Sequence, residues 1–310
     1  MSDLSNPIFQ DAEKAREWLE ATLWPQGPVC PHCGVVSQAT LMTGKTHRPG
    51  LYQCNACREP FSVTVGTLYE RSHIPLNKWL MATHLLMASK KGMSTRQISR
   101  MLGVSVKSAW FMMHRVRESL RSGGLAPMGG GSGPVEIDET YLGQDGDNPP
   151  KGKHRRGVNK MKVLALVDRV SGEARSMVVD DMKAKTLLPI IRENIAKETA
   201  VMTDGATYYS KLGRHFLTHE SVDHMNDEYV RGDVHTNTVE GYFSIFKRGM
   251  RGAYQHCAKK HLHRYLSEFD FRYSNRIARG VDDSQRTRKA LKGIVGKRLT
   301  YRRTNEAETI

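Results

Sequence analysis

The second half of the chain predicts an α/β domain built on a mixed sheet. Four apolar runs of strand type occur there, VEIDE, MKVLALVD, ARSMVVD and AVMTD, together with helix-like segments near 183–197 and from about Asn237. This alternation is typical of a sheet flanked by helices. Two smaller regions precede it, one rich in Cys and Gly over residues 26–66 and one with helical periodicity over residues 76–121.

Length and composition predict several domains. A chain of 310 residues exceeds what one ordinary core needs. The clearest boundary is SGGLAPMGGGSGP, where six glycines and two prolines interrupt the helical pattern and indicate a flexible linker. The expected parts are an N-terminal helical segment (1–25), a cysteine-rich domain (26–70), a helical region (74–121), the linker (122–134), the α/β domain (135–276) and a basic C-terminal tail (277–310).

The charge balance favours a polyanionic partner such as double-stranded DNA. Lys and Arg number 47 against 32 acids, which gives a net charge of +15 and a pI near 9.7. The alternative is a basic surface without a specific partner. No apolar run approaches the roughly 18 residues of a membrane span, and the N-terminus is too polar for a signal peptide. We therefore expect a cytoplasmic, nucleoid-associated protein without a membrane partner.

Four cysteines have the spacing of a zinc ribbon over residues 26–70. Cys30 and Cys33 form one CxxC pair, Cys54 and Cys57 form another, and twenty residues separate the pairs. Four thiolates of this spacing close a tetrahedron around one structural Zn²⁺. Disulfides are the alternative, which a reducing compartment disfavours. Cys257 has no nearby partner in the sequence and is expected to be a packed thiol.

Residues 74–121 predict a helix-turn-helix. Ser94 can cap a helix that ends near Leu102, Gly103 can supply the turn, and Ser105 can cap a second helix to about Leu120. A second helix of this kind can enter the major groove of DNA. The alternative is a helical hairpin that serves only as scaffold. In the first interpretation Lys107, Ser108 and Arg115 face DNA, while Ile98, Leu102, Val104 and Ala109 pack inward.

Three acids stand at positions where an α/β sheet can bring them together. Asp138 ends the first strand-like run, Asp204 ends AVMTD, and Glu240 lies in the first turns of the helix that follows. Thirty-five residues separate the second acid from the third. Lys247 follows Glu240 by seven residues, on the same helical face.

Each of these acids also has a local explanation. Asp204 precedes Gly205 and can be a turn residue, and Glu240 can belong to a capping box begun by Asn237. Three independent coincidences would be needed to dismiss all of them. Two further acids, Glu136 and Glu139, alternate with apolar neighbours, so we expect them on a solvated face and assign them no catalytic role.

A shared site for three carboxylates predicts bound divalent metal. Carboxylates in a small space raise each other's pKa unless a cation intervenes. Oxygen ligands without His or Cys select Mg²⁺ or Mn²⁺. Two such ions can activate an oxygen nucleophile and stabilise the leaving oxygen of a phosphodiester.

The motifs VEIDETYLG, TDGATYY and HTNTVEGYFSIFKRG, with the gap between the last two, resemble the DDE transposases of bacterial insertion sequences. The resemblance is to the ISXO-type group, which carries an N-terminal zinc ribbon. It implies an RNase H-like catalytic domain over residues 135–276, in which Asp138, Asp204 and Glu240 hold two Mg²⁺ or Mn²⁺ ions. Some members have Asn as the third residue, which makes Asn237 the alternative to Glu240.

The same resemblance implies where DNA is bound. Lys247 and Arg248 are expected near the DNA at the catalytic site, and the N-terminal region is expected to recognise terminal inverted repeats. The basic segment PPKGKHRRGVNKMK is expected to be a hairpin tip that touches DNA. A homodimer or larger synaptic assembly would hold both ends of the element.

The function expected from these features is DNA transposition, in which metal-dependent cleavage frees 3′ hydroxyls that then attack target DNA. One alternative is an RNase H-like nuclease or resolvase that cleaves without strand transfer. Another is a DNA-binding regulator whose catalytic half is inactive.

Overall fold

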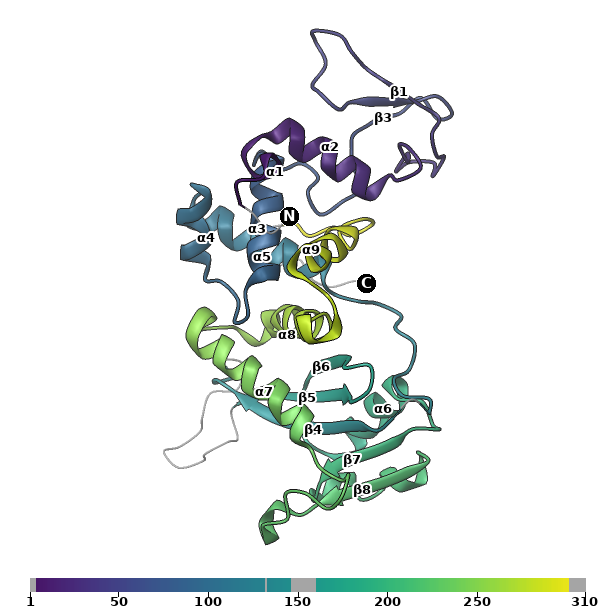
Figure 1. The fold of residues 1–310 in the computed structure, drawn as a ribbon, viewed down its shortest axis with the longest axis vertical. Helices are drawn as coiled ribbons and strands as arrows, with labels where there is room; N and C mark the ends of the chain where they lie inside the picture. Colours follow the sequence, from purple (N-terminus) through teal and green to yellow (C-terminus); the bar gives the residue numbers. More distant parts are fainter. Residues whose placement is uncertain (1–3, 132, 146–159, 301–310) are drawn as a thin grey trace. The chain divides into compact units, whose positions relative to one another are not determined.

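The computed structural model describes residues 4–131, 133–145 and 160–300 (Figure 1). These residues form two compact units. The first takes its described residues from Met1–Ser89, Met93–Leu120 and Asp282–Ile310, and the second takes its own from Lys90–Gly92 and Arg121–Val281. Within the described ranges, no helix combines the length and apolar character that a bilayer crossing needs. Most of the predicted basic hairpin tip lies outside the described residues.

The second unit contains a mixed five-stranded sheet, as the strand pattern predicts. Its strands are β4 (Val135–Leu142), β5 (Met161–Asp168), β6 (Ala174–Val179), β7 (Ala200–Asp204) and β8 (Thr218–Val222). Their order is β6-β5-β4-β7-β8, with β4, β5 and β6 antiparallel and β4, β7 and β8 parallel. The acid-bearing strands β4 and β7 are therefore neighbours and run in the same direction.

Helices cover both faces of this sheet. Helices α7 (Asn237–Gly249) and α8 (Lys259–Ser274) pack on one face, and α6 (Ala184–Asn194) packs on the other (Figure 1). Val135 and Ile137 of β4 belong to the core under α6. Since side chains alternate along a strand, the even-numbered positions of β4 face α7 and α8 instead.

Short turns complete the second unit. Single 3₁₀ turns are η1 (Thr207–Tyr209), η2 (Leu212–Arg214), η3 (His224–Asn226) and η5 (Ile277–Arg279), and a π turn, η4, spans Met250–Tyr254. The turn η1 directly follows the end of β7, so it lies beside the last residue of that strand. The turn η2 leads towards the start of β8, at the opposite end of the strands.

Helix α7 begins one residue earlier than a capping box at Asn237 would require. Its N-cap is Thr236, and the Thr236 hydroxyl donates a hydrogen bond of 2.8 Å to Glu240 Oε1. Asn237 is the first helical residue and is exposed. The buried side chains of α7 are spaced for one apolar face, and they are Val239, Tyr242, Phe243 and Phe246. That face packs against the sheet and leaves Glu240 outside the core.

The first unit combines a small sheet with six helices among its described residues. The sheet consists of β1 (Ala39–Leu41), β2 (Tyr52–Cys54) and β3 (Pro60–Phe61). The helices are α1 (Pro7–Gln10), α2 (Ala12–Leu23), α3 (Leu76–Ala88), α4 (Thr95–Leu102), α5 (Val106–Ser119) and α9 (Asp283–Lys292). The two helices predicted after Ser94 and Ser105 are thus present as α4 and α5.

The predicted caps of α4 and α5 are confirmed. Ser94 accepts a hydrogen bond from the Gln97 N–H at 3.2 Å, and Ser105 accepts one from the Ser108 N–H at 3.1 Å. Gly103 ends α4 with a φ of 59°, in the left-handed region where a side chain would be strained. Ile98, Leu102 and Ala109 are buried between the helices, as their pattern indicates.

The basic tail predicted for residues 277–310 contains the helix α9, which packs into the first unit. Asp282 and Gln285 form its capping box. Ala290, Leu291 and Ile294 are buried, and the guanidinium of Arg286 donates to the Met87 carbonyl oxygen at 2.6 Å. A tail is therefore the wrong description for this part. Its few apolar residues share one face, and the many charged residues around them hide this pattern in the sequence.

Candidate active site and metal centre

Asp138 and Asp204 converge, although only Asp204 lies at a strand end as predicted. Asp138 is the fourth residue of β4, which continues to Leu142 because it stays paired with β5 along its whole length. The pairing of β4 with β7 matches Glu136 to Met202, and two more residues along this register bring Asp138 opposite Asp204. One carboxylate oxygen of each, together with one of Glu139, lies within 4.8 Å of the others. We call these three residues the acid cluster.

Glu139 is the first residue whose expected position is wrong, because it does not face solvent. Both its oxygens are engaged: Tyr209 donates a hydrogen bond of 2.8 Å to Oε2, and Tyr208 donates to Oε1. These tyrosines belong to η1, just after Asp204 in the chain. Burial raises the pKa of Glu139, although the Tyr208 and Tyr209 hydroxyls oppose this shift. The turn η1 therefore covers the middle of β4, and Glu139 joins the acid cluster.

Electrostatics show that the acid cluster favours a cation or a proton. Burial, followed by the negative charge of Glu139, raises the pKa of Asp138 to about 8. The charges of Asp204 and Glu240 act in the same direction, while the Glu139 backbone N–H, which donates to Asp138 at 2.7 Å, lowers the pKa. Clustered, partly buried oxygens without His or Cys are a donor set that suits Mg²⁺ or Mn²⁺.

Glu240 lies near the acid cluster but outside it. Its charge contributes to the raised pKa of Asp138, yet it is absent from the group of oxygens within 4.8 Å that the described residues form. Its side chain is 47% exposed, with the Thr236 hydroxyl bound to Oε1 and His224 Nε2 at 3.9 Å. Few contacts therefore hold Glu240 in its present orientation.

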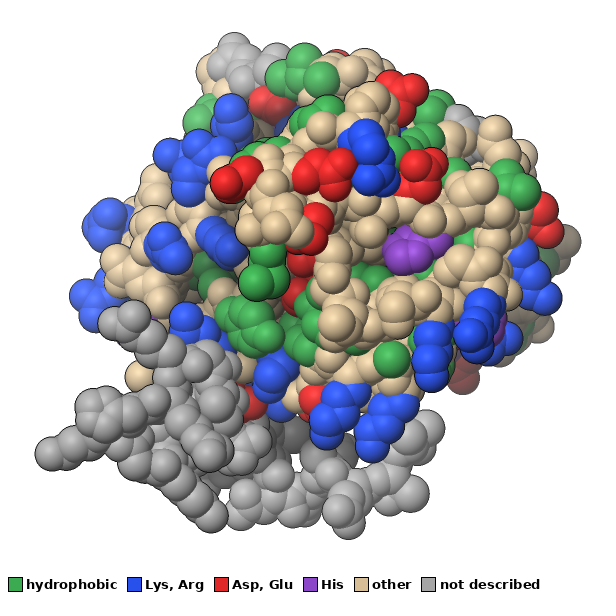
Figure 2. Space-filling view, turned by 90° about the horizontal axis from the view of Figure 1, so that it is seen from below, with side chains coloured by type: hydrophobic (Ala, Val, Ile, Leu, Met, Phe, Trp, Pro, Cys, Tyr) green, Lys and Arg blue, Asp and Glu red, His purple; other side chains and the backbone are tan. Residues whose placement is uncertain are grey.

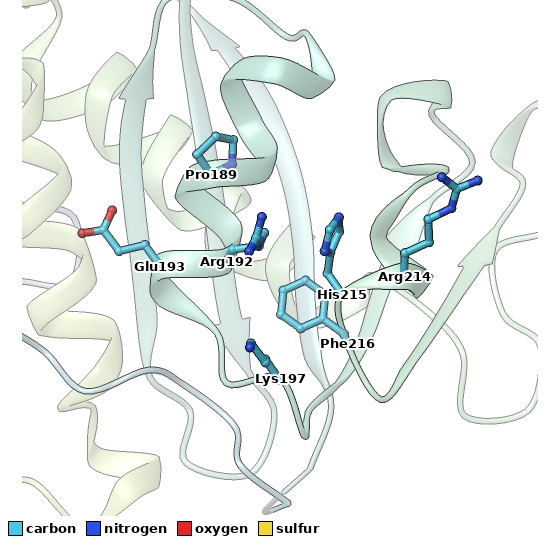
Figure 3. Close-up of a pocket in the computed structure, with 7 residues that line it drawn as sticks. All are labelled: Pro189, Arg192, Glu193, Lys197, Arg214, His215 and Phe216. Atoms are coloured by element: carbon cyan, nitrogen blue, oxygen red, sulfur yellow. The ribbon is translucent and has the colours of Figure 1, made fainter.

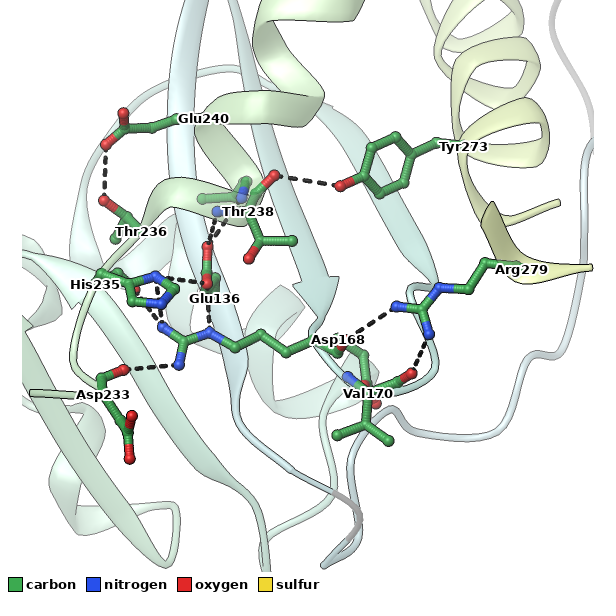
Figure 4. Close-up of polar contacts among 12 residues, drawn as sticks. Glu136, Asp168, Val170, Asp233, His235, Thr236, Thr238, Glu240, Tyr273 and Arg279 are labelled. Atoms are coloured by element: carbon green, nitrogen blue, oxygen red, sulfur yellow. Dashed lines mark hydrogen bonds and ion pairs between the residues drawn. The ribbon is translucent and has the colours of Figure 1, made fainter. Parts of the chain in front are cut away.

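Glu136 is the second acid whose expected solvated position is wrong, since its side chain is fully buried. Oε1 pairs with Arg169 Nε at 2.5 Å. Oε2 accepts hydrogen bonds from the backbone N–H groups of Thr238 and Val239, at 2.8 and 2.9 Å (Figure 4). The first N–H groups of a helix lack partners within the helix and attract negative charge. Glu136 thus ties the start of α7 to the strand that carries Asp138.

Arg169 extends this connection to the loop before α7. Its guanidinium donates to the carbonyl oxygens of Asp233 and His235, at 2.7 and 2.8 Å (Figure 4). It also donates to His235 Nδ1 at 2.8 Å. Because arginine can only donate, this nitrogen must accept, so its 3.2 Å approach to Glu136 is not a hydrogen bond. The residues Glu136, Arg169 and His235 form what we call the α7 anchor.

The residues predicted to contact DNA near the catalytic site lie on α7. Lys247 is half-buried, with its Nζ 5.8 Å from the centre of the Phe243 ring, and Arg248 is exposed. Lys247 lines a cavity of about 590 Å³ at the end of β4, together with Tyr141, Lys160, Arg251 and others. On the face seen in Figure 2, acidic side chains lie near one another and many Lys and Arg side chains lie towards the edges.

The residues predicted to contact DNA from the first unit differ in their surroundings. Lys107 is exposed in the first turn of α5, and Ser108 accepts a hydrogen bond from the Ser105 hydroxyl at 2.9 Å. Arg115 is half-buried and donates to the carbonyl oxygens of Glu70 and Leu299, at 3.3 and 3.2 Å. The expectation that Arg115 faces DNA is therefore unsupported, because its guanidinium binds the unit's own backbone.

The four predicted zinc ligands form a second cluster, in the first unit. The sulfurs of Cys30, Cys33, Cys54 and Cys57 lie within 4.8 Å of one another, with separations of 3.7 Å for Cys30 and Cys57 and 3.6 Å for Cys33 and Cys54. Zn–S bonds of about 2.3 Å in a tetrahedron give sulfur separations of about 3.8 Å. All four are free cysteines, so the disulfide alternative does not hold. The cluster supports a structural zinc ion.

Local backbone N–H groups favour the thiolate of Cys54, whereas at Cys57 the Glu59 backbone N–H is outweighed by burial and the other thiols, which raise the pKa of Cys57 to about 12. The Cys57 backbone N–H, as the largest cause, lowers the pKa of Cys54 to about 6, which favours the thiolate that binds metal. Gly34 has a φ of 77° and donates its N–H to the Cys30 carbonyl oxygen at 2.9 Å, which closes the turn of the first pair. Phe61 packs beside the cluster.

A mixed sheet between helices, with carboxylates gathered on two neighbouring parallel strands, has the architecture of an RNase H-like domain. Residues 131–274 match the family model described as the ISXO2-like transposase domain, and residues 10–59 match the transposase zinc-ribbon domain. The chain belongs to this family of transposases, with the zinc ribbon ahead of the transposase domain.

Two curated proteins are similar to this chain. A Halobacterium salinarum protein, described as an uncharacterized protein in transposable element ISH50, is 29% identical over 277 residues, which cover 85% of this chain and 91% of that protein. A Haemophilus influenzae protein, described as an uncharacterized transposase-like protein, is 27% identical over 100 residues, covering 32% of this chain and 80% of its own length.

The similarity to solved structures is weaker than the similarity to these two proteins. A simian T-cell lymphotropic virus intasome with the PP2A regulatory subunit B56 gamma gives a TM-score of 0.29 at 11% identity, covering 56% of this chain and 63%, less than two thirds, of that chain. The Mos1 mariner paired end complex with Mn gives 0.24 at 10% identity, covering 63% and 77%. The family assignment rests on the matched domains and not on these structures.

Proposed function

We propose that this transposase cleaves the ends of its DNA element and joins them to target DNA at the acid cluster. The observation that carries this proposal is the convergence of Asp138 and Asp204 from parallel neighbouring strands. Their oxygens would hold Mg²⁺ or Mn²⁺, which when bound as a pair would activate an oxygen nucleophile and stabilise the leaving oxygen. The raised pKa of Asp138 supports this, since a cation would relieve the repulsion that now favours its protonated form.

We assign the third carboxylate to Glu240. It is exposed, few contacts hold it, and it already influences Asp138 electrostatically, so a side-chain rotation can direct it to a shared ion. Glu139 is the rival ligand because it belongs to the acid cluster. However, its two oxygens already accept hydrogen bonds from Tyr208 and Tyr209, so its better role is to hold η1, and with it the end of β7, in place. Asn237, whose amide binds Mg²⁺ less well than a carboxylate, is the remaining alternative.

The α7 anchor would position Glu240 for this role. Glu136 bonds to the N–H groups one and two residues before Glu240 and belongs to the same strand as Asp138. Since Glu136 is fully buried and both its oxygens are bonded, the start of α7 is fixed relative to β4. A fixed backbone lets a small side-chain rotation, and not a loop movement, complete the site.

The DNA-binding surfaces follow from the same arrangement. Lys247, Lys160 and Arg251 would hold the backbone of the reacting strand in the cavity at the end of β4, and exposed Arg248 would contact its phosphates. In the first unit, α4 and α5 would act as a helix-turn-helix that reads the terminal inverted repeats, with Lys107 at the start of the second helix. A homodimer or larger assembly would hold both ends, and zinc would stabilise the ribbon.

The test is a gel assay with duplexes that carry the sequences flanking the gene, some already cut at the 3′ end. With Mg²⁺, we expect cleavage of intact ends and strand-transfer products from pre-cut ends. Asp138→Asn and Glu240→Gln should lose both while still binding DNA, and the exposed control Glu220→Gln on β8 should lose neither. Nicking without joining would identify a nuclease, and DNA binding without either reaction would identify a regulator.

A further inference from the structure

A basic pocket of about 490 Å³ lies on the α6 side of the second unit and shares no residue with the acid cluster. Its charged lining is Arg192 near the end of α6, Lys197 in the following loop, and Arg214 and His215 in the segment before β8. Phe216 lines the pocket, is 7% exposed, and belongs to the core under α6. Residues from two stretches of the chain, 189–197 and 214–216, thus meet around an apolar, packed base (Figure 3).

The basic side chains of this pocket outnumber its acids. Glu193 is the only acid in the lining, and it points away from the basic side chains (Figure 3). Among the described residues, none of Arg192, Lys197 and Arg214 takes part in an ion pair. A cation at the end of a helix is favourable by itself, which accounts for Arg192 alone. Like charges brought together from separate segments repel, so their gathering indicates an anionic ligand.

The basic pocket lies at the other end of the strands from the acid cluster. Lys197 comes three residues before β7 begins, whereas Asp204 ends that strand. Arg214 and His215 precede β8, whose first residue, Thr218, pairs with Ala200 at the start of β7. Four steps of about 3.3 Å separate Ala200 from Asp204 along β7, so one phosphate group cannot contact both sites.

We propose that the basic pocket binds backbone phosphates of duplex DNA, in a contact separate from the one at the acid cluster. This inference rests on the DNA-processing role proposed above. The occupant is DNA because the chain is a transposase with a net charge of +15, and because phosphate oxygens match guanidinium and ammonium donors. The contact would hold a DNA segment other than the scissile phosphodiester.

The test measures how duplex binding by the full chain depends on salt. A pocket variant, Arg192→Gln with Lys197→Gln and Arg214→Gln, is compared with a control variant, Lys185→Gln with Lys260→Gln and Lys292→Gln, which removes the same charge from exposed positions elsewhere. The probe is a labelled 30-base-pair DNA duplex of arbitrary sequence, without divalent ions. Each phosphate contact contributes about 0.9 to the slope of log K against log salt concentration. Three lost contacts should therefore reduce the slope by about 2.7.

We expect the loss in the pocket variant and almost none in the control. A charge-keeping variant, Arg192→Lys with Lys197→Arg and Arg214→Lys, should retain the parental slope, which separates lost contacts from misfolding. An equal reduction of the slope in the pocket and control variants, or no reduction in either, would overturn the proposal. The same measurement is made with an RNA duplex of the same length, and a reduction seen only with that RNA would also overturn it. If Asp138→Asn still cleaved and joined DNA at the parental rate, the proposed active site would be wrong. The result on duplex binding by the basic pocket would still hold.

Discussion

The carboxylate of Glu136 caps helix α7 by accepting the backbone N–H of Val239 at 2.9 Å, although the two residues are 103 positions apart. Its other oxygen pairs with Arg169. This fully buried acid therefore joins the strand of Asp138 to the helix of Glu240. It gives the second unit a rigid connection at the place where the proposed site needs one.

Loss of the Glu136 charge should destabilise the protein strongly. Glu136→Gln leaves the Arg169 charge without its partner, and breaking a buried pair costs about 3 kcal/mol or more of unfolding free energy. Urea unfolding followed by circular dichroism measures the change, with Glu220→Gln as an exposed control that should shift by less than about 0.5 kcal/mol. In the double variant with Arg169→Met, part of the loss should return. A Glu136→Gln protein as stable as the control would show that the pair is dispensable.

Metal affinity should rise with pH up to the pKa of Asp138. Below about 8 this carboxyl is mostly protonated in the metal-free protein, and its proton must leave before an ion binds. The affinity for Mn²⁺ should then increase about tenfold per pH unit between pH 6 and 8 and level off above. Electron paramagnetic resonance of free Mn²⁺ measures it. A flat profile across this range would contradict the assigned protonation.

Glu139 should influence the pH dependence of Mn²⁺ affinity without being essential for Mn²⁺ binding. Its charge is the largest cause after burial that raises the pKa of Asp138, so Glu139→Gln should lower this pKa. The levelling-off of Mn²⁺ affinity should move to lower pH, whereas Glu220→Gln should leave it in place. The amide oxygen can still accept from Tyr209, so the fold should survive. Complete loss of Mn²⁺ binding would instead make Glu139 the third ligand in place of Glu240.

The zinc ribbon should bind one ion and depend on it. Cys57→Ser removes one of four converging thiolates, and the expected zinc content falls from about one ion per chain to well below one. Atomic absorption measures zinc, and limited proteolysis should show new cleavage within residues 26–66. Cys257→Ser, outside the four-cysteine cluster, is the matched control and should keep its zinc. Full zinc content in Cys57→Ser would refute the assigned ligand set.

Much of the site could be predicted from the sequence because its signals are local. The CxxC pairs, the caps Ser94 and Ser105, and the positions of Asp138 and Asp204 on apolar strands each depend on a few neighbouring residues. A sheet then brings such residues together by its own geometry. The zinc cluster and the meeting of the two aspartates follow from these patterns.

The remaining features depend on residues far apart in the chain. Alternation in VEIDET places Glu136 and Glu139 correctly on opposite faces, but it does not reveal that α7 and η1 cover them. Glu136 meets partners 33 and about a hundred residues away, Arg169 and the start of α7. Helix α9 was obscured for a related reason, since its apolar face is short and its partner α3 lies about two hundred residues earlier. No periodicity in one segment contains such information.

The most direct test of the proposed active site is the Mg²⁺-dependent cleavage rate of Asp204→Asn at matched DNA binding. Loss of one carboxylate from the acid cluster should slow cleavage and strand transfer by more than about a hundredfold, with the melting temperature and DNA affinity almost unchanged. Cleavage and joining at the parental rate would contradict the claim that Asp138 and Asp204 together hold the ions that cut DNA.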